Sequence, residues 1–260
     1  MSQTPPLKIA VAGALGRMGQ AVTRAVEARE DMTVAARFDG PGADDPALVT
    51  VGAAITMSDV IIDFTVPQAS TELAQACAQQ GAPALVIGTT GIRPDQEAAI
   101  AEASKRIVIV KAGNFSLGVN MLMGLVRQAA AALPARDWDI EVFEAHHRRK
   151  VDAPSGTALM LGLAAADGRG IDLSANSERG RDGMTGPRKE GAIGFSVLRG
   201  GDIIGEHSVS FAADEEILTL SHSARDRTLF AKGALAAALW TRDKPPGLYD
   251  MQDVLGFTGR

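Results

Sequence analysis

Two adjacent histidines and a lysine, His146, His147 and Lys150, lie within a span of five residues. Imidazolium and ammonium groups can both give up a proton, so this segment gathers proton donors and positive charge in one place. Histidine in particular can release a proton at neutral pH and regain it from water. The pattern favours catalysis by proton transfer, and the alternative interpretation is a solvated, charged loop.

A helix is expected directly after this segment. Ser155 precedes an alanine- and leucine-rich run at 158–166, and serine is a preferred N-cap residue. The backbone amides of Gly156 and Thr157 would then lie at the positive end of the helix, where anions bind. Proton donors beside an anion site suit a small anionic substrate that must be protonated.

A strand, a glycine-rich turn and a helix are expected at the start of the chain. The β-rich run 7–12 leads into Gly13, Gly16 and Gly19, and an amphipathic segment follows at 20–28. This order is the dinucleotide-binding fingerprint, here with the variant spacing G-x-x-G-x-x-G. The first glycine permits a tight turn, the second lets the backbone approach a pyrophosphate, and the third lets the helix pack closely.

Asp39 ends the next expected strand, 33–38, about twenty residues after the glycines, where a carboxylate accepts hydrogen bonds from the adenosine ribose. A turn aspartate is the alternative. Gly40, and not an arginine, follows Asp39, so nothing stands there to hold a 2′-phosphate. NADH is therefore favoured over NADPH, although Arg17 or Arg37 would be able to compensate.

Strands and helices alternate as far as residue 111, which predicts an α/β fold with a Rossmann-like, doubly wound parallel sheet. The segment 45–57 is expected to be irregular. In such a sheet, ligands bind in loops at the carboxyl ends of the strands. Two further loops follow strands at that edge, and their residues are Gly88, Thr89 and Thr90 and then Ala112, Gly113, Asn114 and Phe115.

The remaining sequence predicts a second α+β domain with an open, mainly antiparallel sheet. Its expected strands are 138–145, 193–198, 202–205, 206–211 and 216–222, with a hairpin turn at Gly200 and Gly201 and a long loop at 167–188. The helix 228–240 and the tail 251–257 are expected to return to the first domain. The predicted division is 1–117 with 227–260 for dinucleotide binding, and 118–226 for substrate binding and self-association.

Composition limits the classes of function. The net charge of −5 argues against a nucleic-acid binder, and no apolar run reaches the roughly 18 residues that span a bilayer. The polar start of the chain does not resemble a signal peptide. A single cysteine, Cys77, excludes an internal disulfide framework, and no spacing of histidines, cysteines and carboxylates suggests a metal site. A soluble, cytoplasmic enzyme without metal is expected.

Several motifs together resemble the 4-hydroxy-tetrahydrodipicolinate reductase family, also called dihydrodipicolinate reductases. The most specific is E-A-H-H-x-x-K-x-D-A-P-S-G-T-A at 144–158, and the others lie at 11–19, 87–91, 113–120 and 181–207. The resemblance implies reduction of 4-hydroxy-tetrahydrodipicolinate to tetrahydrodipicolinate, with loss of water and hydride transfer from NADH or NADPH, in lysine and diaminopimelate biosynthesis. It also implies a homotetramer that binds a small dicarboxylate.

The resemblance assigns roles residue by residue. His146 would be the general acid/base and Lys150 a second proton donor, while His147, Ser155, Gly156, Thr157 and Arg227 would hold the substrate carboxylates. The cofactor would be bound by Asp39, by the loops 88–90 and 112–115, and by the glycine-rich turn, whose residues are Gly13, Ala14, Leu15, Gly16, Arg17 and Met18.

Two other functions remain open. A related semialdehyde dehydrogenase would need a nucleophilic cysteine or a different acid/base set in the second domain, but Cys77 is in the first. A non-catalytic NAD sensor would keep the fold and lose the proton donors, whereas His146 and Lys150 are both present. Within the motif, His147 has the alternative role of orienting its neighbour. His207 and His222 are expected to be structural, and Arg148 and Arg149 to be surface charges.

Overall fold

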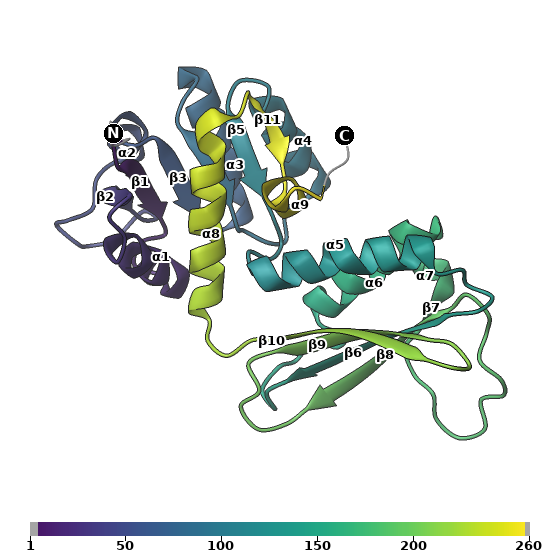
Figure 1. Ribbon diagram of the computed structural model, residues 1–260. Coiled ribbons are helices and arrows are strands. Elements are labelled where there is room, and N and C mark those ends of the chain that lie inside the picture. The colour runs from purple at the N-terminus through teal and green to yellow at the C-terminus, as the bar shows by residue number, and fades with distance from the viewer. Residues whose placement is uncertain (1–4, 258–260) are drawn as a thin grey trace. The chain divides into compact units, whose positions relative to one another are not determined.

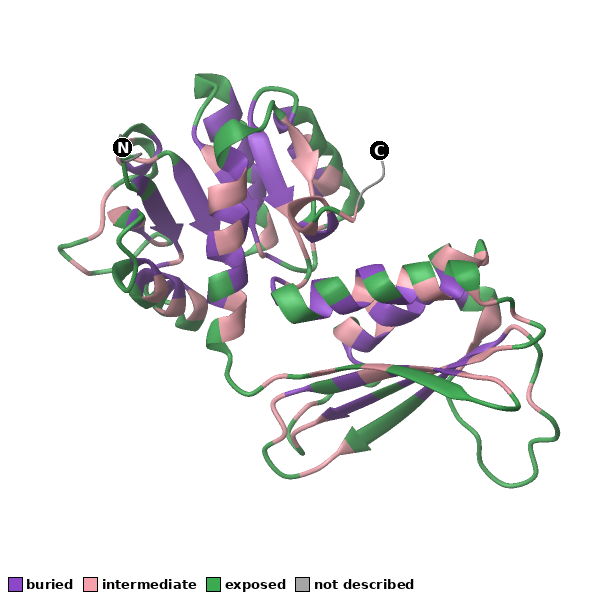
Figure 2. Ribbon diagram, in the orientation of Figure 1, coloured by how far each residue is buried: buried purple, intermediate pink, exposed green. Residues whose placement is uncertain are grey.

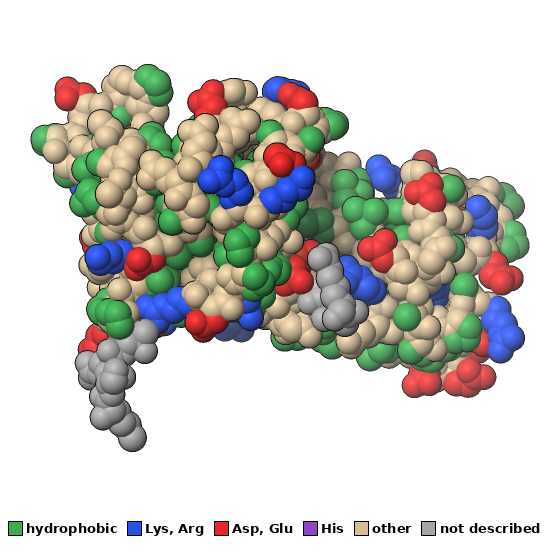
Figure 3. Space-filling view, turned by 90° about the horizontal axis from the view of Figure 1, so that it is seen from above, with side chains coloured by type: hydrophobic (Ala, Val, Ile, Leu, Met, Phe, Trp, Pro, Cys, Tyr) green, Lys and Arg blue, Asp and Glu red, His purple; other side chains and the backbone are tan. Residues whose placement is uncertain are grey.

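The computed structural model describes residues 5–257 and contains two compact units (Figure 1). The first unit combines the residues up to Leu117 with those from Thr228 onward, and the second is Gly118–Arg227. Arg227 therefore belongs to the second unit, one residue beyond the predicted boundary. Within the described residues, no helix has both the length and the apolar character needed to span a membrane. On the face in Figure 3, acidic and basic side chains are interspersed.

The first unit is built on a six-stranded sheet in which every pairing is parallel. In spatial order its strands are β11 (Gly247–Tyr249), β5 (Val108–Lys111), β4 (Ala84–Ile87), β3 (Val60–Asp63), β1 (Leu7–Ala12) and β2 (Met32–Phe38). The direction of strand order reverses between β1 and β3. Ligands of doubly wound sheets bind at such a point, beyond the carboxyl ends of the strands.

Helices enclose this sheet, and its central strands β1, β3 and β4 are buried on both faces (Figure 2). Ile9 and Val11 point into one core, while Ala10 and Ala12 point into the other. The helices are α1 (Arg17–Glu27), α2 (Val51–Met57), α3 (Pro67–Gln80), α4 (Pro94–Ala103), α8 (Thr228–Trp240), the 3₁₀ turn η1 (Thr241–Asp243) and α9 (Met251–Leu255). The predicted parallel α/β sheet is confirmed.

The segment 45–57, which the sequence predicts to be irregular, ends in a helix. Thr50 caps α2, because its Oγ1 accepts a hydrogen bond from Ala53 N at 3.3 Å. The helix has only seven residues and buries Ala54 and Ile55 against the first sheet. Such a short helix depends on packing more than on sequence propensity, which explains why its sequence signal is weak.

The close approach of α8 to the loop after β5 requires a glycine. A Cβ atom on Gly233 would lie 1.6 Å from the carbonyl oxygen of Phe115. We expect Gly233→Ala to destabilise the protein by about 1–3 kcal/mol or more, because overpacking displaces the backbone. Gly52→Ala in the exposed first turn of α2 is the control, since that Cβ meets nothing within 4 Å. Denaturant unfolding of both variants checks the expectation, and equal midpoints would contradict it.

The second unit pairs a five-stranded mixed sheet with helices. In spatial order the strands are β10 (Ile217–Ser223), β9 (Glu206–Ala212), β6 (Asp139–His146), β8 (Ile193–Arg199) and β7 (Ser177–Glu178). The helices are α5 (Leu117–Ala132), α6 (Gly156–Arg169) and α7 (Leu173–Asn176). Alternate side chains of β6, β8 and β9 form the core with α5 and α6. The sequence predicts a mainly antiparallel sheet, but β6–β8 and β7–β8 are parallel pairs.

The connection from β8 to β9 corrects two predictions. Residues 202–205 form no strand, and the turn at Gly200 and Gly201 closes no hairpin, because β8 and β9 lie on opposite sides of β6. The turn instead binds the end of β6: Gly200 N donates to His146 O at 3.0 Å and Arg148 N donates to Gly201 O at 3.2 Å. It therefore fixes the backbone on both sides of the histidine pair.

Candidate active site

Strand β6 places Glu144 and His146 on the same side of the second sheet. Side chains two residues apart on a strand share a face, and the preceding members of this face, Ile140 and Val142, are buried in the core. Glu144 is 1% exposed. His146, at the end of the strand, is half-buried. Along this face of β6, Glu144 is therefore enclosed while His146 is partly accessible from outside.

The carboxylate of Glu144 binds three residues. His146 Nδ1 lies 2.5 Å from Oε2, and Ser155 N donates to Oε1 at 2.9 Å. Arg199, at the end of the neighbouring strand β8, donates to both oxygens at 2.7 Å. Strand β8 is paired with β6 so that Arg199 lies opposite His146. The parallel pairing therefore brings the guanidinium to the carboxylate.

These contacts determine the charge states of Glu144 and His146. Burial opposes ionisation of Glu144, but Arg199, His146 and the Ser155 amide together hold the pKa of this carboxyl below its usual value. Burial also lowers the pKa of His146 below its usual value, although the Glu144 carboxylate opposes this effect. Lys150 and Arg199 lower the pKa of His146 further by their positive charge. In the free protein, Glu144 is therefore ionised and His146 gives up its proton readily.

Lys150 lies in the turn that follows the histidine pair. Its backbone N donates to His147 O at 3.1 Å, and its Nζ lies 2.8 Å from Asp152 Oδ1. This ammonium holds the pKa of Asp152 below its usual value. The turn thus brings Lys150 close enough to influence His146 electrostatically while Asp152 orients it.

Ser155 caps α6 as predicted, because its Oγ accepts a hydrogen bond from Ala158 N at 3.1 Å. The same Oγ lies 3.2 Å from His207 Nε2. Ser155 is 2% exposed and its amide is bound to Glu144, so its polar groups are engaged within the protein. A Cβ on Gly156 would meet nothing within 4 Å, which leaves space beside the first turn of the helix.

His207, which the sequence analysis expects to be structural, lies against the histidine of the motif. The His146 and His207 rings meet edge to face with centroids 5.1 Å apart. Burial, and then the charge of His146, lowers the pKa of His207 to about 4. His207 is therefore neutral at physiological pH and connects Ser155 to the ring of His146. Arg227 is exposed between β10 and α8, and its contact with a substrate stays a prediction.

Neither Glu144 nor Arg199 is among the residues that the sequence predicts for the site. One signal was present for Glu144, since it is two residues before His146 in an expected strand and must share its face. Arg199 is 55 residues further along the chain, and only the pairing of β6 with β8 brings it to Glu144.

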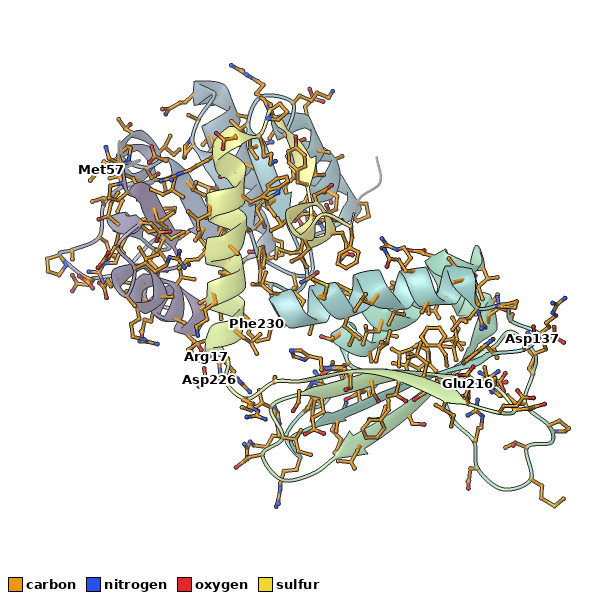
Figure 4. All side chains as sticks on the ribbon, in the orientation of Figure 1. Arg17, Met57, Asp137, Glu216, Asp226 and Phe230 are labelled. Carbon is orange, nitrogen blue, oxygen red and sulfur yellow. The ribbon has the colours of Figure 1, made fainter. Side chains whose placement is uncertain are left out.

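The glycine-rich turn of the first unit has the geometry that a pyrophosphate needs. Gly13 has φ +66°, and Gly16 N donates to Gly13 O at 3.0 Å. A Cβ on Gly19 would lie 2.1 Å from Gly13 O, so α1 packs directly against the turn. Gly16 caps α1 without any side-chain hydrogen bond, which leaves the positive end of the helix open to an anion. Figure 4 labels Arg17, in the first turn of α1.

Asp39 lies beside this turn. Its Oδ2 accepts from Leu15 N at 2.7 Å and its Oδ1 from Gly40 N at 2.8 Å, while Ala14 N donates to Phe38 O. The carboxylate therefore lies next to the pyrophosphate turn, where the adenosine ribose of a dinucleotide would be held. A Cβ on Gly40 would meet nothing within 4 Å.

The loops 88–90 and 112–115, which follow β4 and β5 at the carboxyl edge of the first sheet, would contact a ligand through backbone groups. Gly88 lies against Phe64, since a Cβ there would be 2.1 Å from its ring, and Thr89 is buried and accepts from Ser70 Oγ at 2.7 Å. Phe115 is 1% exposed and packs edge to face on Phe64. The residues thus fit a dinucleotide. Among the described residues, no cluster of histidines, cysteines and carboxylates is arranged to hold a metal ion.

A Rossmann-like parallel sheet joined to a second, mixed-sheet unit is the architecture of two-domain NAD(P)-dependent oxidoreductases. Residues 7–115 match the family description Dihydrodipicolinate reductase, N-terminus, and residues 118–255 match Dihydrodipicolinate reductase, C-terminus. The chain belongs to the dihydrodipicolinate reductase family, which confirms the resemblance found in the sequence.

Relatives cover nearly the whole chain. A 4-hydroxy-tetrahydrodipicolinate reductase of Caulobacter vibrioides is 67% identical over 257 residues, 99% of each chain. One from Rhizobium rhizogenes is 53% identical over 270 residues, 98% of each chain. The dipicolinate-bound dihydrodipicolinate reductase of Paenisporosarcina sp. TG-14 shares the fold, with a TM-score of 0.79 at 24% identity over 95% of this chain and 98% of that one.

Proposed function

We propose that the protein reduces 4-hydroxy-tetrahydrodipicolinate to tetrahydrodipicolinate, with loss of water, in lysine and diaminopimelate biosynthesis. The Caulobacter vibrioides relative is named 4-hydroxy-tetrahydrodipicolinate reductase and is 67% identical over 99% of this chain. The single structural observation that supports the proposal best is the placement of His146 and the first turn of α6 on one carboxylate, Glu144. This arrangement combines a proton donor with an anion site, as protonation of a small dicarboxylate requires.

In the proposed reaction, the 4-hydroxyl group of the substrate leaves as water together with a proton from the neighbouring carbon, which gives a conjugated imine. A bound NADH or NADPH would supply a hydride to the carbon that carried the hydroxyl group. The protein then has to protonate a neighbouring atom. His146 donates this proton from Nε2, because Nδ1 is bound to Glu144. Lys150 attracts a carboxylate or the ring nitrogen and donates as a second acid. His147 and Arg227, with the backbone amides of Gly156 and Thr157 at the start of α6, hold the carboxylates of the substrate, while Ser155 caps the helix.

The cofactor would be held by the first unit. The amides at the start of α1 would bind the pyrophosphate, and Asp39 would accept hydrogen bonds from the ribose hydroxyls. The loops 88–90 and 112–115 would contact the nicotinamide half through backbone groups. NADH is the preferred cofactor in this proposal, because a carboxylate at this position attracts ribose hydroxyls and repels a 2′-phosphate.

The second unit is proposed to form a homotetramer as well as to bind substrate. One face of its sheet has no helix of the same unit over it (Figure 1), and this face exposes Phe143 at 37%, Leu198 at 43% and Ile217 at 68%. An open sheet with exposed apolar residues favours pairing with another copy. Sedimentation or light scattering measures the oligomeric state directly, and a monomer at micromolar concentration would exclude this part of the proposal.

Oxidation of NADH and NADPH at 340 nm tests the function, with the substrate formed in the cuvette from pyruvate and aspartate semialdehyde by the preceding synthase. We expect turnover that requires the synthase product. Protein that binds NADH but gives no turnover with either cofactor would refute the reductase proposal and favour a non-catalytic NAD sensor.

Gly40→Arg tests the basis of cofactor preference. An arginine side chain at position 40 has open space, since a Cβ there would meet nothing within 4 Å. Its guanidinium, beside Asp39, would bind a 2′-phosphate. We expect kcat/KM for NADPH to rise about tenfold or more relative to NADH, since a hydrogen bond to a charged group contributes about 1.5–3 kcal/mol. Gly40→Gln is the control that adds bulk without charge. An unchanged NADPH-to-NADH ratio in Gly40→Arg would mean that this position does not face the ribose.

A further inference from the structure

The carboxylate of Glu144 has four hydrogen-bond donors around it, two on each oxygen. Oε2 faces His146 Nδ1 and Arg199 Nη1, while Oε1 faces Ser155 N and Arg199 Nη2. An ionised carboxylate only accepts hydrogen bonds, so it can satisfy all four donors. An amide side chain of the same size has a single oxygen and would turn an NH₂ group toward at least one Arg199 donor.

This arrangement determines which nitrogen of His146 can react. Glu144 is ionised and accepts, so Nδ1 carries the hydrogen and Nε2 is the nitrogen left for a substrate. Gly205 lies at that side of the ring, and a Cβ there would be 3.2 Å from Nε2. The hydrogen bond thus selects the tautomer, and the glycine leaves room at the reacting atom.

The same carboxylate also fixes the start of α6. Its Oε1 holds the amide of Ser155, one residue before the first helical residue, Gly156. Arg199 supports the carboxylate from the adjacent strand and also donates to Asp152 O at 2.6 Å, in the turn between β6 and α6. Glu144 and Arg199 together therefore connect His146, the start of α6 and the turn between them.

We infer that Glu144, held by Arg199, is a positioning residue that sets the tautomer of His146 and fixes the spacing between His146 and the first turn of α6. It touches neither substrate nor cofactor in this role. The inference deepens the proposed function and rests on it only for its kinetic consequences, because tautomer and pKa can be measured without turnover.

The first test uses the unaltered protein. The chain has four histidines, so ¹⁵N-labelled imidazole signals can be assigned with one His→Gln variant at each position. We expect neutral His146 to be protonated at Nδ1, with a strongly downfield-shifted, slowly exchanging proton, as a 2.5 Å contact with a carboxylate requires. Protonation of neutral His146 at Nε2 would overturn the inference.

The second test is Glu144→Gln. We expect the neutral ring of His146 to shift toward the Nε2-protonated form and its pKa to fall, because the carboxylate that opposes the effect of burial is lost. The other groups that face His146, namely Lys150, Arg199 and His207, stay in place. Since a wrong tautomer costs on the order of 10⁴-fold in a serine protease, we expect kcat to fall on the order of 10²–10⁴-fold.

Glu141→Gln is the matched control. Glu141 is on the same strand but on the opposite face, where it pairs with Arg181 and Arg188. It should leave the His146 tautomer, its pKa and kcat unchanged. A Glu144→Gln protein with the imidazole signals and kcat of Glu141→Gln would overturn the inference. Unaltered protein that shows the expected tautomer but no turnover would refute the proposed reaction and leave the positioning role standing.

Discussion

Replacing His146 by glutamine should lower kcat on the order of 10²–10⁴-fold, the usual cost of losing a general acid. Glutamine fills much of the same space and can still donate a hydrogen bond to Glu144, so the buried carboxylate keeps a partner. Its amide cannot transfer a proton. Substrate binding and NADH binding should therefore change little, and steady-state kinetics with fluorescence titration of NADH would separate the two effects. A kcat within threefold of the unaltered protein would contradict the role of His146.

The pH dependence provides a second check on His146. An acid acts in its protonated form, so kcat/KM should fall as pH rises through the lowered pKa of this histidine in the free protein. A bound dicarboxylate raises that pKa by its negative charge, and kcat should hold to a higher pH. The declines of kcat/KM and of kcat with rising pH should both be absent in His146→Gln. His207→Gln should retain them, because His207, with a pKa of about 4, is already neutral.

Replacing Arg199 by methionine should destabilise the protein by about 3–5 kcal/mol, the usual cost of removing one partner of a buried ion pair. Glu144 is 1% exposed, and Arg199 supplies two of its four hydrogen bonds. Its carboxylate would then be buried without its guanidinium. Glu144→Gln/Arg199→Met removes the charge as well and should recover part of the loss. Denaturant unfolding followed by circular dichroism measures the free energy of unfolding of the unaltered protein and of both variants.

The loss in Arg199→Met should depend on pH with a definite sign. In the unaltered protein, the depressed pKa of Glu144 contributes stability that is present above its unfolded value and is lost as pH falls through the folded one. Without Arg199, burial raises this pKa, so Arg199→Met should cost less at pH 5 than at pH 8. Arg181→Met is the control, because that guanidinium is 40% exposed and such pairs contribute about 0–1 kcal/mol. Equal losses in the two variants would contradict the prediction.

The sequence patterns that could be interpreted were local ones. Continuous apolar runs such as 60–63 predicted buried parallel strands, and the glycines at 13, 16 and 19 predicted the turn that the structure contains. Ser155 also predicted the start of a helix correctly, because helix capping is a local interaction between residues three apart.

The errors arose where distant segments decide the structure. Two glycines between expected strands favour a hairpin, but β6 pairs with both β8 and β9 and separates them. The same insertion makes the sheet mixed and brings Arg199 opposite His146. Nothing within a few residues of Arg199 indicates this partner. The polar support of the candidate site was therefore hidden from the sequence, although the proton donors themselves were not.

The sequence order of the first unit has a consequence for how the chain is made. Strand β11 and helix α8 are encoded after the whole second unit, yet β11 pairs with β5 and α8 packs in the first core. During synthesis, β6 to β10 leave the ribosome as one uninterrupted segment and can close their sheet early. Strand β5 meanwhile waits with one edge unpaired until Gly247–Tyr249 emerges. Throughout that interval the nascent chain carries an open sheet edge, the kind of surface that chaperones protect from aggregation.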